Sequence, residues 1–201
     1  WLRFQLAAPG HGYEYFAQVN YQPKRGTQVY LRFKDEVKSH NFSDENNQTN
    51  YLVEHRKINT RLHYQTKITK ALEWRSRLAF SFYNDSESWS KGFVLFQDLI
   101  YKPMGFPLDF STRFALFDTD NYDTRIYAYE SDLLYSFSVP PYYNRGSRFY
   151  FNVGFRGIRN LTLEARISQT KITNQDVIGS GLNEIDRNTQ TEVKFQARYR
   201  F

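Results

Sequence analysis

The chain has 201 residues, a net charge of +6 and no cysteine, and it combines 18 Phe and 16 Tyr with a mean hydropathy of only −0.69. No stretch approaches the roughly 20 consecutive apolar residues of a transmembrane helix, which excludes a helical membrane protein. The absence of cysteine excludes disulfides and thiolate metal sites. A membrane β-barrel stays open, because its lipid-facing apolar residues alternate with polar lumen residues and the two cancel in a hydropathy average.

Apolar and polar residues alternate with period two from end to end, which predicts strands throughout the chain. The predicted strands lie near residues 1–8, 12–21, 26–37, 54–68, 71–83, 92–102, 107–118, 125–139, 146–156, 161–172 and 190–201. Many exceed ten residues, whereas strands of soluble sheets usually have about 5–6 residues and a tilted bilayer crossing takes about 9–11. We therefore predict an all-β fold, an antiparallel up-and-down transmembrane β-barrel with little or no helix.

The connections and the strand count together predict the topology. Residues 39–53, 84–91 and 173–189 are long and polar while 69–70 and 157–160 are tight, an asymmetry typical of outer-membrane barrels. Eleven strands conflict with the even strand number of bacterial barrels. An extracellular loop over 39–53 would make the strand at 26–37 run outward, whereas counting back from a periplasmic C-terminus makes it run inward. A turn near Glu130, Ser131 and Asp132 would split residues 125–139. We thus predict about twelve strands, with ten as the next choice, in one domain over residues 1–201.

Charged residues on the polar faces are expected to point into the lumen, because an Arg facing mid-membrane lipid would cost about 2–4 kcal/mol. The predicted lumen charge cluster comprises Arg75, Arg77, Arg113, Arg148, Arg166, Arg198, Glu73, Asp109 and Glu164. Paired charges in so narrow a barrel favour a plugged lumen over an open one, and the positive excess would favour anions in a pore. An interfacial aromatic girdle is expected from Tyr13, Tyr15, Tyr21, Tyr51, Trp89, Tyr101, Tyr122, Tyr127, Tyr142 and Tyr143.

The last ten residues, EVKFQARYRF, form an amphipathic strand that stops on an aromatic residue. This pattern is similar to the C-terminal signal of outer-membrane proteins. We expect Phe195, Tyr199 and Phe201 to act as an assembly signal for the barrel-assembly machinery, since an apolar unpaired edge can add to another sheet. The first residues are strand-like, without a signal peptide, so we expect a fragment or the mature C-terminal part of a longer chain.

The stretches GFVLFQDLIYKP, FALFDTDNYDTRIYAYESDLLYSFSVPPYY and IGSGLNEI, followed by the terminal strand, carry a family resemblance. Residues 92–201 resemble the C-terminal barrel region of large Bacteroidota outer-membrane proteins whose N-terminal part carries helix-hairpin-helix repeats. No such repeat is visible in the 201 residues. Any DNA-binding role that the resemblance implies would belong to other sequence.

Catalytic and metal chemistry find little support in the sequence. The chain has four His and no GxSxG elbow, and His55 and His63 lack an adjacent triad arrangement. Asp118, Asp120 and Asp123 lack the Gly and Glu of an EF-hand loop, which favours a solvated polar loop. We predict no catalytic, cofactor or metal site.

The functional expectation is a bacterial outer-membrane anchor or scaffold, or a narrow pore that favours anions. Its expected surroundings are the lipid bilayer and lipopolysaccharide. The alternatives are an outer-membrane hydrolase with a lumen or loop site, and the barrel part of a DNA-uptake or secretion-related component. A nucleic-acid partner is disfavoured for this segment, because its basic residues are strung along strand faces instead of clustered.

Overall fold

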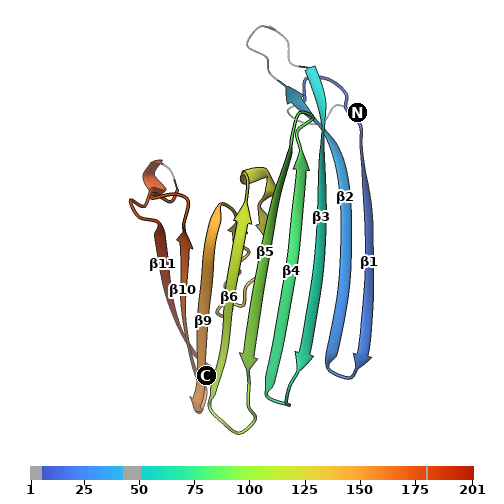
Figure 1. The fold of residues 1–201 in the computed structure, drawn as a ribbon. Coiled ribbons are helices and arrows are strands. Elements are labelled where there is room, and N and C mark those ends of the chain that lie inside the picture. Colours follow the sequence, from blue (N-terminus) through green and yellow to red (C-terminus); the bar gives the residue numbers. More distant parts are fainter. Residues whose placement is uncertain (1–5, 43–50, 180) are drawn as a thin grey trace.

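A computed structural model of the chain describes residues 6–42, 51–179 and 181–201. Within them, nine long strands form one antiparallel sheet in the order β1-β2-β3-β4-β5-β6-β9-β10-β11 (Figure 1). The strands are β1 (Gly12–Lys24), β2 (Thr27–Phe42), β3 (Tyr51–Lys67), β4 (Leu72–Asn84), β5 (Trp89–Tyr101), β6 (Leu108–Thr119), β9 (Arg145–Ile158), β10 (Leu161–Ile172) and β11 (Thr189–Tyr199). The all-β, antiparallel, up-and-down prediction is confirmed at this level, and nine of the eleven predicted strands are present within a few residues of their expected bounds.

The remaining elements are short. Two strands, β7 (Ile126–Tyr127) and β8 (Pro141–Tyr142), form a separate small sheet, and the 3-10 turns η1 (Tyr122–Thr124) and η2 (Gly181–Asn183) are the described helical elements. None of the described helices has the length and apolar character needed to cross a membrane.

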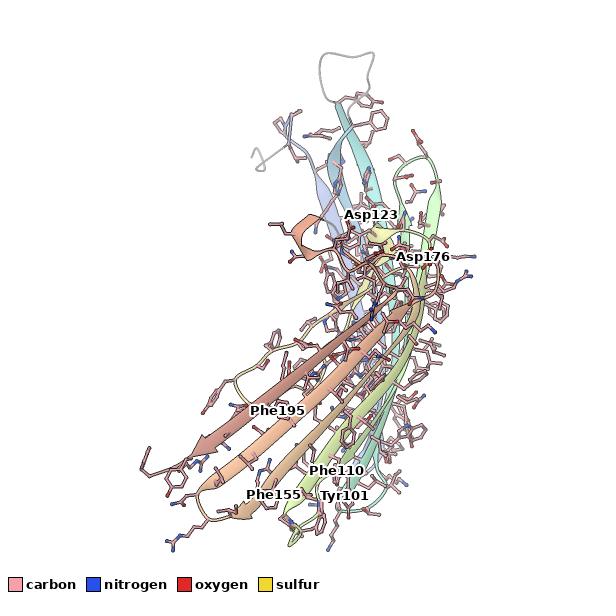
Figure 2. All side chains as sticks on the ribbon, turned by 90° about the vertical axis from the view of Figure 1, so that its left-hand side faces the viewer. Tyr101, Phe110, Asp123, Phe155, Asp176 and Phe195 are labelled. Carbon is pink, nitrogen blue, oxygen red and sulfur yellow. The ribbon has the colours of Figure 1, made fainter. Side chains whose placement is uncertain are left out.

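The sheet is curved (Figure 2), and its two faces differ in chemistry. On β4, Leu72, Trp74, Leu78, Phe80 and Phe82 lie on one face, and Glu73, Arg75, Arg77, Ala79 and Ser81 on the other. We call the first the outer face. The second is the inner face, on which residues 120–144 pack. The alternation arises because successive side chains of a strand point to opposite sides.

Connections differ between the two ends of the sheet (Figure 1). Residues 25–26, 68–71, 102–107 and 159–160 turn at the end where the C-terminus lies, while 120–144 and 173–188 connect strands at the other end. The loop predicted over 39–53 is shortened by the extension of β2 and β3, and its tip lies outside the described residues. The connection predicted over 84–91 is a tight turn of residues 85–88, closed by the Asp85 carboxylate, which accepts the Ser88 amide at 2.8 Å.

Two predicted strands are corrected. Residues 125–139 do not cross the sheet: the chain leaves β6, folds over the inner face and returns at β9, which pairs directly with β6. This removes one strand where the sequence had suggested adding one, and it reconciles the strand directions equally well. Of the predicted strand 1–8, residues 1–5 lie outside the described part, and Leu6–Ala8 form no strand.

The sheet is open. In the described residues β1 pairs only with β2, and β11 only with β10. Both edge strands run in the same direction (Figure 1), because nine strands alternate between them. The predicted closure and count of twelve are therefore not confirmed.

Candidate functional site

The connection over residues 120–144, which we call the folded-in connection, turns onto the inner face at η1. Asn121 caps this turn, because its side-chain oxygen accepts the amides of Asp123 and Thr124, both at 3.1 Å. Gly92 on β5 lies directly beneath, where an added Cβ would sit 2.9 Å from the Thr124 carbonyl oxygen and 2.7 Å from a Thr119 methyl group. A glycine at position 92 is therefore what lets the chain approach the sheet this closely.

An apolar cluster holds the first half of the folded-in connection. Small side chains on the inner face, such as Ala79 and Ala115, leave room for Ile126 and Ala128, and Tyr142 stacks edge-on against Phe117 at 5.4 Å between ring centroids. The buried cluster comprises Ala79, Val94, Phe96, Ala115, Phe117, Ile126, Ala128, Tyr142 and Ile172. Burial of these groups on the inner face stabilises the docked connection, at about 25 cal/mol per Å² of apolar surface.

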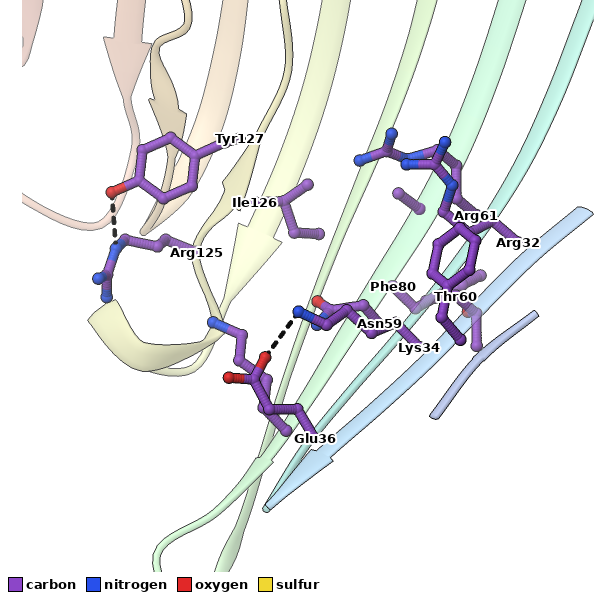
Figure 3. Close-up of a pocket in the computed structure, with 13 residues that line it drawn as sticks. Arg32, Lys34, Glu36, Asn59, Thr60, Arg61, Phe80, Arg125, Ile126 and Tyr127 are labelled. Atoms are coloured by element: carbon purple, nitrogen blue, oxygen red, sulfur yellow. Dashed lines mark hydrogen bonds and ion pairs between the residues drawn. The ribbon is translucent and has the colours of Figure 1, made fainter. Parts of the chain in front are cut away.

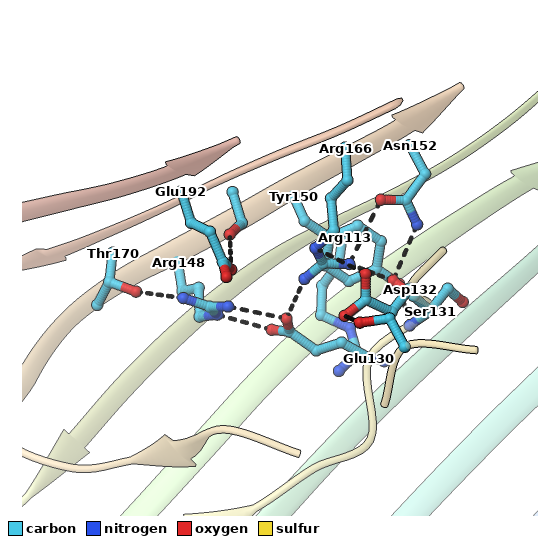
Figure 4. Close-up of polar contacts among 12 residues, drawn as sticks. Arg113, Glu130, Ser131, Asp132, Arg148, Tyr150, Asn152, Arg166, Thr170 and Glu192 are labelled. Carbon is cyan, nitrogen blue, oxygen red and sulfur yellow. Dashed lines mark hydrogen bonds and ion pairs between the residues drawn. The ribbon is translucent and has the colours of Figure 1, made fainter. Parts of the chain in front are cut away.

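Glu130 anchors the second half of the connection through charge (Figure 4). Its side chain is fully buried and accepts hydrogen bonds from Arg148 Nε at 2.8 Å and Nη2 at 3.0 Å, from Arg166 Nη2 at 2.6 Å and from the Tyr142 hydroxyl at 2.8 Å. Arg166 also lies over the Tyr150 ring, 4.5 Å from its centroid. Two arginines from β9 and β10 thus share one buried carboxylate.

Asp132 and Ser131 extend this network across to β11. The Asp132 carboxylate accepts Lys194 Nζ at 3.0 Å and lies 3.7 Å from Arg166 Nε. The Ser131 carbonyl oxygen accepts both Arg166 and the side-chain amide of Asn152. The connection is therefore fastened to three consecutive strands, β9, β10 and β11.

These contacts keep both carboxyl groups ionised. Burial alone would raise the pKa of Glu130, but the hydrogen bonds and charges of Arg148, with those of Tyr142 and Arg166, outweigh it and hold that pKa below its usual value. Burial likewise opposes ionisation of Asp132, and Lys194, the Leu133 amide and Arg166 lower its pKa in the balance.

A second buried ion pair lies under the connection. Arg113 on β6 donates to both carboxylate oxygens of Asp98 on β5, at 2.5 and 2.8 Å, and its guanidinium lies 3.6 Å from the centroid of Phe96. A bidentate pair of this kind has a fixed geometry that makes it stronger than a simple contact. The Arg113–Asp98 ion pair links the neighbouring strands β5 and β6 on the inner face.

All nine residues of the predicted lumen charge cluster lie at inner-face positions, and seven of them fall into two groups. Arg113, Arg148 and Arg166 belong to the ion pairs above. Glu73, Arg75, Asp109 and Glu164 line one cavity of about 400 Å³, where Arg75 contacts Glu73 at 2.6 Å and Arg156 contacts Asp109 at 2.6 Å. Arg77 and Arg198 lie apart from both groups. Arg77 meets His63 at 3.4 Å, and the buried Nε of Arg198 has no hydrogen-bond partner in the part of the chain described.

The predicted assembly signal lies at the open edge of the sheet. Phe195 projects from the outer face of β11 with 81% of its surface exposed, and the rings of Tyr199 and Phe201 meet edge-on at 5.3 Å (Figure 2). The signal itself stays a prediction.

The predicted aromatic girdle needs one correction. Tyr13, Tyr15, Tyr21 and Tyr101 are exposed near strand ends, as expected, but Tyr142 is buried in the folded-in connection. Tyr122, Tyr127 and Tyr143 belong to the same connection, and Tyr127 receives a hydrogen bond from Arg125. These four tyrosines therefore lie in the segment that covers the inner face and are not part of an outer girdle.

The histidines and loop aspartates do not converge on a reactive centre. His55 stacks on His40 at 4.3 Å and contacts the Tyr83 hydroxyl, and His63 lies elsewhere on β3. Asp118 pairs with Arg145, Asp120 accepts the Lys91 amide and Asp123 lies 3.9 Å from Arg125. Across the described ranges, no group of three His, Cys, Asp or Glu residues could hold a metal ion.

The anchoring role of Glu130 and Asp132 was not predicted, since the strand pattern indicated a turn at these residues. Two signals in the sequence do indicate a segment that covers the inner face. Val94 and Phe96 make the inner face of β5 apolar, and Ala79 and Ala115 put small residues beside them, a pattern that calls for a covering segment.

Comparison with protein-family models, curated proteins and solved structures finds no match for the chain.

Proposed function

We propose that the chain forms the membrane-spanning wall of a bacterial outer-membrane β-barrel that serves as an anchor or scaffold, with a lumen narrowed by the folded-in connection. The exposed apolar outer face carries this proposal. Leu31, Leu62, Phe114, Phe151 and Val193 each leave 40% or more of their surface exposed there. A soluble protein rarely exposes so extended an apolar surface, whereas lipid covers one on a barrel.

The polar inner face supports the same proposal. Buried ion pairs such as Arg113–Asp98 and Arg166–Glu130 lie opposite the apolar band, as in barrels whose lumen is polar. Strand lengths of 11–17 residues suffice for a tilted bilayer crossing of about 9–11 residues. Short turns and the C-terminus share one end, which in this proposal faces the periplasm.

Barrel closure sets a requirement on strand number. Because β1 and β11 run in the same direction, antiparallel closure takes an odd number of further strands between them. In lipid an open edge would leave backbone groups unsatisfied, so closure is obligatory. The barrel-assembly machinery is the proposed partner for this step, with lipopolysaccharide and phospholipid as surroundings. The resemblance to the Bacteroidota barrel family agrees with this assignment.

A narrow pore that favours anions is the second candidate, and one observation favours it. Arg32, Lys34, Lys57 and Arg61 line an inner-face cavity in which Glu36 is the carboxylate among the described lining residues. Cationic lining attracts anions into a pore.

Fractionation and conductance test these proposals. We expect the protein to be recovered with the outer membrane, to resist carbonate extraction and to show heat-modifiable mobility in detergent gels. Recovery as a soluble monomer without detergent would contradict the barrel. In planar bilayers, silence supports the anchor, a small anion-selective current supports the narrow pore, and a large unselective current contradicts a lumen narrowed by the connection.

A further inference from the structure

The inner face is electrostatically divided. On β5 to β10, Arg113, Arg148 and Arg166 each bind a carboxylate within 2.8 Å. On β2 to β4, Arg32 and Arg61 have no carboxylate partner in the described part of the chain. The difference concerns individual positions, since Arg75 on the inner face of β4 contacts Glu73 at 2.6 Å whereas Arg32 and Arg61 have no such partner among the described residues.

Arg32 and Arg61 are direct cross-strand neighbours on the inner face (Figure 3). Arg32 Nε donates to the neutral side chain of Gln18 at 2.7 Å, and its guanidinium lies 5.4 Å from the Phe16 ring centroid. Arg61 has neither a hydrogen bond nor an ion pair among the described residues. Like charges directly opposite each other destabilise a sheet, so this pair costs stability unless an anion lies between the two side chains.

The surroundings of the pair form a cavity of about 370 Å³. Its walls also carry Lys34 and Lys57. Lys34 is balanced by Glu14 at 2.9 Å and Glu36 at 2.7 Å, and Lys57 donates to the Asp123 carbonyl oxygen of the folded-in connection. The nearby carboxylates therefore pair with Lys34, and the guanidinium charges of Arg32 and Arg61 are left without a carboxylate partner among the described residues.

Arg125 closes the cavity from the folded-in connection. It is held in place by the Tyr122 carbonyl oxygen at 2.8 Å and the Tyr127 hydroxyl at 3.0 Å, and its guanidinium lies 4.0 Å from the Tyr122 ring centroid. Its partial pairing with Asp123 is long, at 3.9 Å. The cavity is thus walled by cations from the sheet and from the connection that covers it (Figure 3).

We propose that this cavity binds a small oxyanionic solute, one that bears phosphate or carboxylate groups, through the paired guanidiniums of Arg32 and Arg61. The planar guanidinium fork matches carboxylate and phosphate oxygens, which halide ions do not offer. The cavity volume suits a small solute. The inference deepens the anion-favouring part of the proposed function and rests on the inner face being the lumen.

Calorimetry on the full chain folded in detergent tests the site, with inorganic pyrophosphate and citrate as probes in buffers matched in ionic strength with sodium chloride. We expect one or both to bind, and Arg61→Gln to weaken that binding by about tenfold or more, as expected for loss of a charge-assisted hydrogen-bonding partner. Pyrophosphate alone would identify a phosphate-bearing solute, and citrate alone a carboxylate-bearing one.

Arg75→Gln is the matched control, because it removes the same charge from the inner face of β4, where Arg75 contacts Glu73 outside the cavity. We expect it to change affinity less than about twofold, since only long-range attraction is lost. Equal weakening by both variants would overturn the site in favour of general electrostatic attraction.

A stability measurement keeps the proposal testable if Arg61→Gln folds poorly, and Arg32→Gln serves as the second variant. Without oxyanion, either variant should unfold at a higher temperature than the wild type in the gel mobility assay, because cross-strand repulsion is relieved. The probe that binds should raise the unfolding temperature of the wild type and of Arg75→Gln more than that of these variants. If the protein never folds into detergent even with the strands that complete the barrel, the proposed barrel is contradicted. A folded chain that binds neither probe overturns only the oxyanion site.

Discussion

Replacing Glu130 with Gln should release the folded-in connection from the inner face. Glu130 is the shared counter-charge of Arg148 and Arg166, with three hydrogen bonds from their guanidiniums at 2.6–3.0 Å and no exposed surface. Removing one partner of a buried ion pair typically costs about 3–5 kcal/mol, because the remaining charge stays buried without compensation. Gln keeps the shape and one acceptor oxygen, so the lower end of that range applies.

The cost should fall on docking of the connection and leave the sheet intact. The β6–β9 and β9–β10 ladders do not depend on Glu130, whereas the second half of the connection is otherwise held by Asp132 and by the Ser131 backbone. A loss of about 3 kcal/mol corresponds to more than a hundredfold change in the docking equilibrium. We expect faster chymotrypsin cleavage within residues 134–137, where Tyr135 and Phe137 are already exposed, and a larger single-channel conductance.

Asp176→Asn is the control, since it removes a carboxylate from the exposed β10–β11 connection (Figure 2). It should leave cleavage and conductance at wild-type levels. If Glu130→Gln cleaves no faster than Asp176→Asn in the same detergent, the ion pairs do not hold the connection, and the apolar cluster alone accounts for its docking.

Two further predictions follow from the same contacts and from the terminal strand. The lowered pKa values of Glu130 and Asp132 stabilise the docked connection above the ordinary values of 4.5 and 3.8, and this stabilisation is lost as pH falls through the lowered values, so single-channel conductance should rise below about pH 4 and stay flat from pH 6 to 8. A rise in conductance between pH 6 and 8 would contradict this assignment. Replacing Phe195, Tyr199 and Phe201 together with Ser should block membrane insertion and leave periplasmic aggregates, read by cell fractionation, because the apolar edge offered to the assembly machinery is lost. Normal insertion of that variant would show that these three residues are not the assembly signal.

The nine strands could be predicted because their signal is local. On β4 and β10 the alternation of apolar and polar residues indicates which face each side chain occupies, and this pattern does not depend on distant residues. The inner-face position of the charged residues could be predicted on the same basis, since only their parity along the strand matters. What each charge binds could not, because Arg166 meets Glu130 across 36 positions of sequence.

The folded-in connection shows where local pattern reading ends. The sequence IYAYESDLLYSFSV alternates well enough to resemble a strand, and the strand-direction conflict required only that one element be added or removed. Adding a turn at Ser131 and removing the strand altogether satisfy this parity equally well. Tertiary contacts decide between the two: Ile126 and Tyr142 pack in an apolar cluster with β4–β6, and Glu130 pairs with Arg148 and the buried Arg166.

The same contacts explain why the inner face needs the connection. Without residues 120–144, Phe96 and Phe117 would be exposed on a polar surface. Arg148 and Arg166, on neighbouring strands, would lose the carboxylate of Glu130 that pairs with both of them. The sheet and its covering segment are therefore complementary in both apolar and ionic character over β5–β10. On β2–β4 the corresponding complement is missing for Arg32 and Arg61, which lie beyond the reach of Glu130 and Asp132. An anion from solution can supply that complement, because nothing else among the described residues neutralises those two guanidiniums.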